Sequence, residues 1–305
     1  MGLYLGSTKI PTISFYKQGG IVPSGIFTVP SNATSTYDVT SYAFAQVPSG
    51  EDNLWKRIQG VGLSTYSNST ATQIASFAFA YMYDFTSVSM PAVTSIGQFA
   101  FTCCSNITSV SFPLCVSIGS SAFQSCTKLV SVNISNCTSL QGNGIFSGCS
   151  LLPTINLPSV ASSIPAYTFM YCYSLSSANV PLATSIGTYG FGMCSYLSSM
   201  SLSRCSAVGQ YAFQGCSRLS TINLPICSII YAQAFSGCYN LLSMYLTNSS
   251  LCSLSNSNAF TSTPIAGYTT STGGVYGSIY VPSSLLASYK AATNWVNYSN
   301  RMVGV

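Results

Sequence analysis

The chain has 305 residues, of which 48% are hydrophobic and only 4% are charged, and it contains no histidine. Ordinary soluble domains carry about 25% charged residues, so the polar surface here must consist mainly of uncharged side chains. Nine Lys and Arg residues against four Asp and Glu give a net charge of +5, which is too dilute for a nucleic-acid interface. No apolar run in the sequence approaches the roughly 18 residues of a membrane-spanning helix.

Residues 1–72 do not follow the repeat that organises the rest of the chain, and we expect them to form a β-rich N-terminal cap or attachment module. Apolar residues within 3–10 and 13–16 predict a small β element. Residues 42–58 look like a degenerate repeat with a charged insertion. The first residues have neither a basic segment nor a long apolar stretch, so no secretory signal is expected.

Residues 73–260 contain a phenylalanine every 22 or 23 residues, and in most copies a cysteine follows three residues later. The phenylalanines are Phe79, Phe101, Phe123, Phe146, Phe169, Phe191, Phe213 and Phe235, with Phe260 after a longer gap. The cysteines are Cys104, Cys126, Cys149, Cys172, Cys194, Cys216 and Cys238. A fixed period of this length is typical of stacked structural repeats, which present long surfaces to partners.

Each repeat is predicted to contain one short strand. Six residues after Phe213, Leu219 provides an apolar anchor, and Ile222 and Leu224 then alternate with polar residues as in a strand. Proline often ends the segment, as Pro225 does, because it cannot continue a hydrogen-bonded ladder. Strands of successive repeats would lie in parallel, about 4.7–4.9 Å apart. We expect a tight helical turn between phenylalanine and cysteine, and a second short extended piece before each phenylalanine.

These residues, L-x-x-V-x-L-P together with A-F-x-x-C, resemble the BspA-type leucine-rich repeat over residues 73–260. The motif is specific because it returns eight times in register. The resemblance implies a non-catalytic solenoid used for adhesion or recognition at bacterial, protist and some phage surfaces. The opening residues 3–10 are similar to those of phage structural proteins. The expected fold is a leucine-rich-repeat solenoid, mainly β, with one short parallel strand per repeat, short helical turns and a cap at each end.

Residues 261–305 are predicted to form the C-terminal cap. A loop rich in Gly, Thr and Ser is expected at 261–277, and a closing strand at 278–281. Pro282 would then start a helix at 283–293. This tail resembles the terminal segment of many BspA-type repeat proteins.

The thirteen cysteines allow two interpretations. Thiols one rung apart could hold a metal or form disulfides. Alternatively, cysteine fills the core as a small hydrophobic residue. A second column favours the latter, because cysteine there interchanges with Val93, Val160 and Ala183. We therefore predict buried free thiols, no metal site and no cofactor.

Two columns of side chains are candidate binding surfaces. The outward strand positions are uncharged, and they either keep the sheet soluble or bind a glycan or protein. A column two residues before each phenylalanine is rich in aromatics, which either stack on one another as structural rungs or bind a sugar or receptor. The candidate binding residues are Tyr167, Tyr189, Tyr211, Asn133, Asn156, Asn179, Asn223 and Tyr245.

No catalytic residue is predicted, because the chain lacks histidine and only Asp84 is acidic within the repeats. The protein is therefore not expected to be an enzyme. The principal expectation is a phage virion component: a fibre, decoration or receptor-binding protein. It would join other virion proteins through residues 1–72, within a homo-oligomer or larger assembly, and bind a host surface protein or glycan. The alternative is a bacterial cell-surface adhesin or host-interaction protein.

Overall fold

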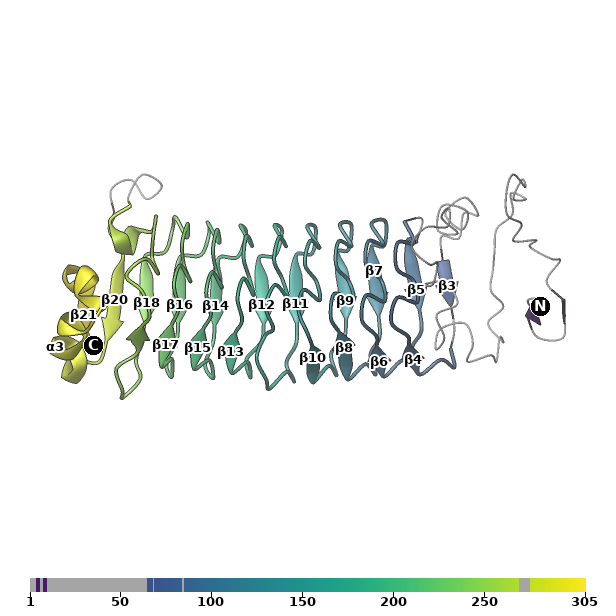
Figure 1. Ribbon diagram of the computed structural model, residues 1–305, viewed down its shortest axis with the longest axis horizontal. Coiled ribbons are helices and arrows are strands. Elements are labelled where there is room, and N and C mark those ends of the chain that lie inside the picture. The colour runs from purple at the N-terminus through teal and green to yellow at the C-terminus, as the bar shows by residue number, and fades with distance from the viewer. Residues whose placement is uncertain (1–3, 6–7, 10–64, 68, 84, 269–274) are drawn as a thin grey trace.

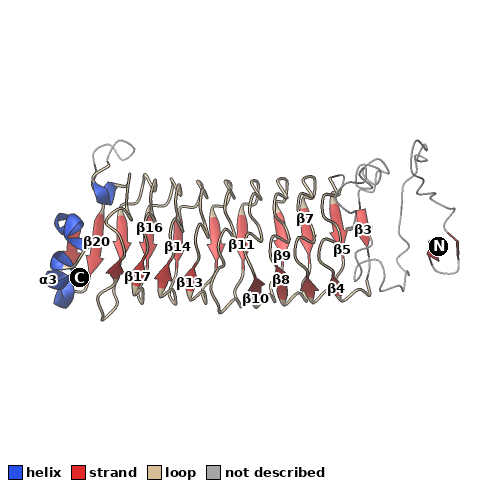
Figure 2. Cartoon of the chain, viewed as in Figure 1, coloured by secondary structure: helices blue, strands red, loops and turns tan. Residues whose placement is uncertain are grey.

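The computed structural model describes these parts of the chain: residues 4–5, 8–9, 65–67, 69–83, 85–268 and 275–305. From Thr65 onward they form a parallel β-solenoid of about ten turns that extends along the long axis of the molecule (Figure 1). A typical coil contains a three-residue strand, a turn, a second short strand and a further turn (Figure 2). The predicted solenoid, with one principal parallel strand per repeat, is confirmed.

The principal strands lie in one row and pair in parallel. They are β3 (Thr65–Ser67), β5 (Ser87–Ser89), β7 (Ser109–Ser111), β9 (Ser131–Asn133), β11 (Thr154–Asn156), β12 (Ser177–Asn179), β14 (Ser199–Ser201), β16 (Thr221–Asn223), β18 (Ser243–Tyr245), β20 (Ser278–Val281) and β21 (Met302–Gly304). Equivalent residues are partners, as Val88 is of Val110 and Val110 of Val132. Hydrogen bonds divide the row into three sheets, ordered β3-β5-β7-β9, β11-β12 and β14-β16-β18-β20-β21.

A second row of strands, each two or three residues long, is formed by segments that follow the principal strands along the chain. These strands are β4 (Gln73–Ile74), β6 (Ser95–Ile96), β8 (Ser117–Gly119), β10 (Ser139–Gln141), β13 (Ser185–Ile186), β15 (Ala207–Val208), β17 (Ile229–Ile230) and β19 (Ser253–Leu254). They form two parallel sheets, β4-β6-β8-β10 and β13-β15-β17-β19. The predicted second extended piece is thus present in most coils.

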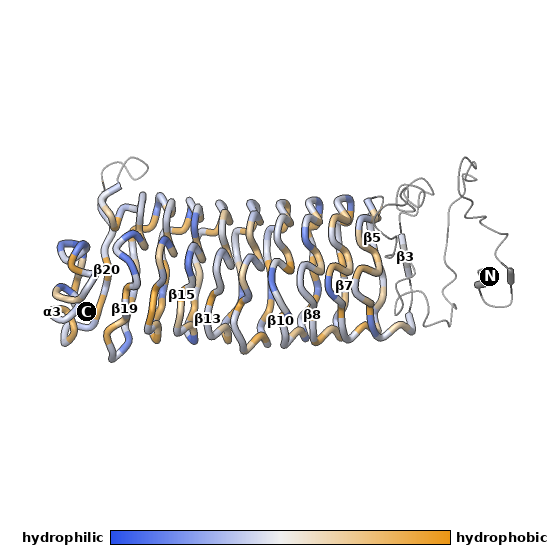
Figure 3. Tube along the Cα trace, in the orientation of Figure 1, coloured by the Kyte–Doolittle hydropathy of each residue, from blue (hydrophilic) through white to orange (hydrophobic). Residues whose placement is uncertain are grey.

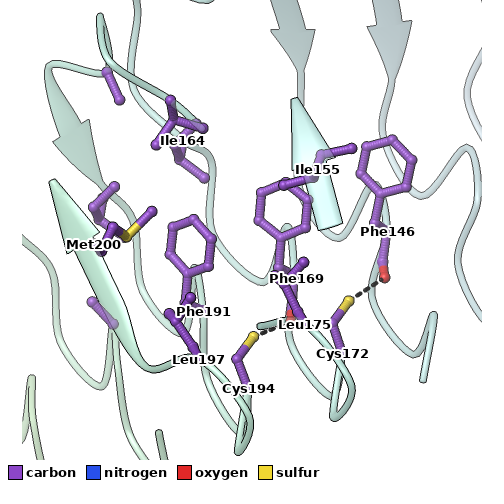
Figure 4. Close-up of a cluster of buried hydrophobic side chains, with 14 of the residues drawn as sticks. Phe146, Ile155, Ile164, Phe169, Cys172, Leu175, Phe191, Cys194, Leu197 and Met200 are labelled. Carbon is purple, nitrogen blue, oxygen red and sulfur yellow. Dashed lines mark hydrogen bonds between the residues drawn. The ribbon is translucent and has the colours of Figure 1, made fainter. Parts of the chain in front are cut away.

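The repeated phenylalanines form one continuous stack in the centre of the solenoid. The buried rings of Phe146 and Phe169 lie 5.6 Å apart between centroids, with an interplanar angle of 2°, and Leu175 lies nearby (Figure 4). All nine rings from Phe79 to Phe260 stack on their neighbours in this way. Hydrophobic and hydrophilic residues alternate along the coils (Figure 3). Burial of each ring contributes roughly 1.5–3 kcal/mol, and a single repeat could not supply that burial alone.

The segment around each phenylalanine consists of successive turns instead of the expected helical turn. In eight successive coils, the residues two before and two after phenylalanine have positive φ. The amides of Phe77, Phe79 and Tyr81 donate to carbonyl oxygens of the next coil, whereas the amides of Ala78 and Ala80 donate three residues back within their own coil. Alternate amides therefore join neighbouring coils, which a helix would not permit because it bonds its amides internally.

The C-terminal residues continue the principal row and then fold against its end. Strand β20 matches the predicted closing strand at 278–281, and β21 pairs with it in parallel. The predicted helix at 283–293 is shorter, because a 3₁₀ turn precedes it and a second one follows. The helices here are η1 (Pro264–Ala266), η2 (Ser283–Leu285), α3 (Leu286–Ala291) and η3 (Trp295–Arg301).

The N-terminal part that the structure describes is small. Strands β1 (Tyr4–Leu5) and β2 (Thr8–Lys9) pair antiparallel, within the predicted β element. The predicted degenerate repeat at 42–58 lies outside the described residues, as does the expected extended segment at 13–16. Strand β3 already pairs with β5, so among the described residues the principal row is present from Thr65, within the predicted N-terminal module of residues 1–72. Among the described helices, none is long and apolar enough to cross a bilayer.

Candidate recognition site

Within the described part of the chain, no three Cys, Asp or Glu residues lie close enough to hold a metal ion. The candidate recognition site consists of two surfaces of the solenoid. We call the outward first and third residues of the principal strands, from β3 to β18, the strand face. We call the residues two before each phenylalanine the aromatic column, which comprises Phe77, Phe99, Ser121, Gly144, Tyr167, Tyr189, Tyr211 and Gln233.

The strand face brings the predicted polar residues into one column. The third residue of each of five strands is a predicted site residue: Asn133, Asn156, Asn179, Asn223 and Tyr245. The four asparagines are exposed, whereas Tyr245 is half-buried. The column follows from strand geometry, since every second residue points to the same face.

Side chains on this face also bond between coils. The amide nitrogen of Asn179 donates to Oδ1 of Asn156 over 2.7 Å, and that of Asn133 donates to Oγ of Ser111 over 3.2 Å. Tyr245 stacks on Tyr280, with ring centroids 4.6 Å apart. An amide nitrogen has two protons, so each donating asparagine retains one for a ligand. The strand face thus presents uncharged hydrogen-bonding groups that recur from coil to coil along the solenoid.

The tyrosines of the aromatic column stack on one another, as one of the two sequence-based interpretations predicts. Centroids of Tyr167 and Tyr189 lie 5.6 Å apart, and those of Tyr189 and Tyr211 lie 4.6 Å apart. Burial raises the pKa of Tyr189, and the nearby hydroxyls of Tyr211 and Tyr167 raise it further, so this ring stays neutral. The inner faces are occupied by neighbouring rings, which leaves ring edges, hydroxyls and the outermost faces for a ligand.

Every member of the aromatic column has positive φ, including Tyr167 at 60° and Tyr189 at 53°. Such values are uncommon for bulky residues. The amide of Tyr167 donates to the carbonyl oxygen of Thr188 in the next coil over 2.8 Å, and ladder bonds of this kind hold the left-handed conformation. Gly144 is the residue in the sequence that indicates a positive φ at this position of the repeat, because glycine is favoured where the backbone is left-handed.

Sequence reasoning missed further exposed tyrosines, which follow core phenylalanines by two to five residues. Tyr171, Tyr173 and Tyr196 are 41%, 44% and 48% exposed. Tyr171 lies close enough to Tyr189 to contribute to its raised pKa. The guanidinium of Arg218 lies 3.9 Å from the centroid of the Tyr196 ring. These positions vary from repeat to repeat, so periodicity could not identify them.

All thirteen cysteines are free, and all except the half-buried Cys103 are buried, which confirms the predicted burial. Seven repeat thiols also donate to the phenylalanine carbonyl of the preceding coil, over 2.9–3.2 Å; the donors are Cys104, Cys126, Cys149, Cys172, Cys194, Cys216 and Cys238. Cysteine is therefore more than an apolar filler. Burial raises the pKa of Cys115 to about 12 and that of Cys137 to about 11, so these thiols stay protonated at neutral pH.

The repeated coil, the phenylalanine stack and the parallel principal strands define a leucine-rich-repeat protein. A family model described as a BspA type leucine rich repeat region matches residues 72–197 and 162–273, with six copies. The chain belongs to the BspA-type leucine-rich-repeat family.

Solved structures of several bacterial proteins are similar. A leucine-rich cell surface protein of Faecalibacterium prausnitzii is 26% identical with a TM-score of 0.50, over 61% of this chain and 61% of that one. A leucine-rich repeat protein of T. pallidum is 24% identical with a TM-score of 0.45, over 51% and 78%. One from Bacteroides ovatus is 21% identical with a TM-score of 0.39, over 61% and 64%. No curated protein sequence matches the chain.

Proposed function

We propose that this chain is a non-enzymatic recognition protein of the bacterial cell surface, whose strand face adheres to a protein or glycan of another surface. Family membership supports this proposal, as does the likeness to the F. prausnitzii protein, which is described as a cell surface protein. The chain spans about 61% of that protein's length. The comparisons do not support the expected virion component and favour the alternative of a bacterial surface protein.

The observation that carries the proposal is the uncharged, exposed strand face. Asn133, Asn156, Asn179 and Asn223 are exposed on successive or nearby rungs, and serine and threonine accompany them in the same strands. Solenoids use such extended surfaces for binding. A ligand that meets several rungs at once gains avidity from contacts that are weak individually.

The test is a binding screen that compares the wild-type chain with variants in which positive charge is introduced on the strand face. The purified chain is applied to immobilised neutral oligosaccharides and purified extracellular matrix proteins. Asn133→Lys combined with Asn223→Lys places two cations on the strand face. The matched control, Ala161→Lys combined with Ala287→Lys, adds the same charge at exposed positions elsewhere.

We expect the wild-type chain to bind at least one of these ligands. The strand-face double variant should bind it at least about tenfold more weakly, while the control variant retains wild-type affinity. An equal loss in both double variants, or no binding by the wild-type chain, would contradict the proposal.

A further inference from the structure

The aromatic column is interrupted over two coils. Phe77 and Phe99 stack with centroids 4.9 Å apart, and the tyrosine stack begins again at Tyr167. Between them the column holds only Ser121 and Gly144. The amide of Gly144 donates to the carbonyl oxygen of Ala166 over 2.9 Å, which places Gly144 in the coil adjacent to Tyr167.

One face of the Tyr167 ring is therefore not covered by another ring within the described part of the chain. Its other face lies on Tyr189. Tyr167 is 40% exposed, whereas Tyr189 and Tyr211 are half-buried. A Cβ atom on Gly144 would meet nothing closer than Oγ of Ser121 at 3.3 Å and Cβ of Ser147 at 3.9 Å. The position beside the Tyr167 ring is thus bordered by small side chains.

The coils before Tyr167 are polar and almost free of charge. Lys128 is the only charged residue between 85 and 203. Ser120 lies in the same turn as Ser121 and is half-buried, with its hydroxyl donating to the carbonyl oxygen of Asn143 over 2.9 Å. Gln124 and Ser147 are half-buried and each follows a core phenylalanine. A nucleic-acid ligand would require cations for its phosphates, and this surface does not supply them.

The ring is also held in place before any ligand arrives. The Tyr167 amide is bonded to Thr188, its φ is 60°, and Tyr189 supports the ring from one side. Preorganisation of this kind reduces the entropy lost on binding. An amphipathic ring with nearby hydroxyl and amide groups is typical of small-ligand sites.

We propose that Tyr167 and the two coils before it form a subsite for a neutral saccharide, whose pyranose ring lies against the face of Tyr167 that no other ring covers. Saccharide hydroxyls complement the serine side chains at its border. The subsite rests on the proposed recognition function and names the ligand class for one part of the surface. It lies on the aromatic column and is distinct from the strand face.

The experiment titrates the full chain with neutral hexoses, N-acetylhexosamines and their oligomers by NMR or calorimetry. Tyr167→Ala removes the aromatic platform. Gly144→Tyr extends the tyrosine stack by one ring and covers this ring face; tyrosine is already found at φ values of 53–60° in this column. Gln233→Tyr, at φ 54°, extends the other end of the column and is the matched control. Thermal unfolding verifies that each variant is folded.

We expect at least one saccharide to bind, with affinity reduced at least about tenfold by Tyr167→Ala and by Gly144→Tyr and unchanged by Gln233→Tyr. The proposed subsite would be wrong if saccharide affinity were unchanged in both Tyr167→Ala and Gly144→Tyr, or if no saccharide bound at millimolar concentration. Binding of a glycan-free protein that Gly144→Tyr abolishes would overturn the saccharide assignment in favour of a polypeptide. If only the subsite is wrong, the chain still binds a ligand in the earlier screen, and the lysine substitutions on the strand face still weaken that binding. If the proposed function is wrong, the chain binds no ligand in that screen either.

Discussion

The thiol of Cys172 donates a hydrogen bond of 3.2 Å to the backbone carbonyl oxygen of Phe146, one coil earlier in the stack (Figure 4). That oxygen already accepts the amide of Cys149 in its own coil, over 3.1 Å. The same relationship recurs at seven rungs, so each of these thiols ties the phenylalanine turn of one coil to the next. Buried acceptors in native proteins are generally satisfied, and here a thiol supplies the second donor.

Cys172→Val should lower the free energy of unfolding by about 1 kcal/mol more than Cys137→Val does. Valine fills a similar volume at both positions but cannot donate. Cys137 belongs to the second column, where valine already occurs naturally, and its thiol lies at a longer 3.6 Å from the Ser139 oxygen. Urea denaturation measures both variants. Equal losses would mean that the thiols act only as filler.

The free energy of unfolding should change with pH in the alkaline range and hardly at all in the acid range. Burial raises the pKa of Cys115 to about 12 and of Cys137 to about 11, above the value near 9 of an unfolded thiol. The unfolded chain therefore releases these protons first, so the free energy of unfolding falls as pH rises above about 9. The chain has only four Asp and Glu residues, so acid has few groups to protonate.

Chemical denaturation at a series of pH values tests this expectation. The free energy of unfolding should be flat below about pH 8, and Cys137→Val should reduce the alkaline slope because it removes one of the titrating thiols. A stability profile that stays level to pH 11 would show that the thiols are not protected by folding.

Phe169→Ala should destabilise the protein by about 3–5 kcal/mol. Phe169 lies in the middle of the stack, 5.6 Å from Phe146 and 5.0 Å from Phe191 between ring centroids. Its loss should also weaken the coupling between the two halves of the solenoid. Calorimetry should show a lower and broader transition. Tyr173→Ala, an exposed control, should change stability by less than about 0.5 kcal/mol; an unchanged midpoint for Phe169→Ala would contradict the phenylalanine stack.

Trp295→Ala tests our proposal that the C-terminal residues cap the solenoid. Trp295 is buried, its indole nitrogen donates to the Cys252 carbonyl oxygen over 2.6 Å, and its ring lies 6.0 Å from that of Phe260. We expect a loss of about 3–5 kcal/mol and faster amide exchange in β18 and β19. Val296→Ala changes an adjacent, exposed residue and should have little effect. A loss of stability without increased exchange at the last coils would argue against capping.

The sequence predicted the principal strands and the polar column well, because both follow directly from periodicity. Ile222 is buried and Asn223 exposed, as strand alternation requires. The same pattern misled us about the turns. Phe213 and Cys216 are three residues apart, which suits one face of a helix, yet the Phe213 amide bonds to Ala234 in the next coil. Spacing alone does not reveal whether an amide bonds within its coil or to its neighbour.

The geometry of the aromatic column could be predicted only in part. The recurrence of Tyr167, Tyr189 and Tyr211 showed that they would lie side by side, but tyrosine gives no signal of a positive φ. Gly144 was the one indication of a positive φ. It can be interpreted in this way only when it is aligned with the tyrosines at the same position of other repeats. The hydrogen bonds of the thiols could not be predicted either. A cysteine at an invariant spacing gives the same sequence pattern whether it only fills the core or also donates a hydrogen bond.

The central claim, a recognition protein of the bacterial cell surface, is tested most directly by antibody labelling of intact cells that express the protein. The antibody is raised against the purified chain, and labelling is compared before and after permeabilisation. We expect strong labelling of intact cells, with little increase after permeabilisation. Labelling that appears only after permeabilisation would contradict it.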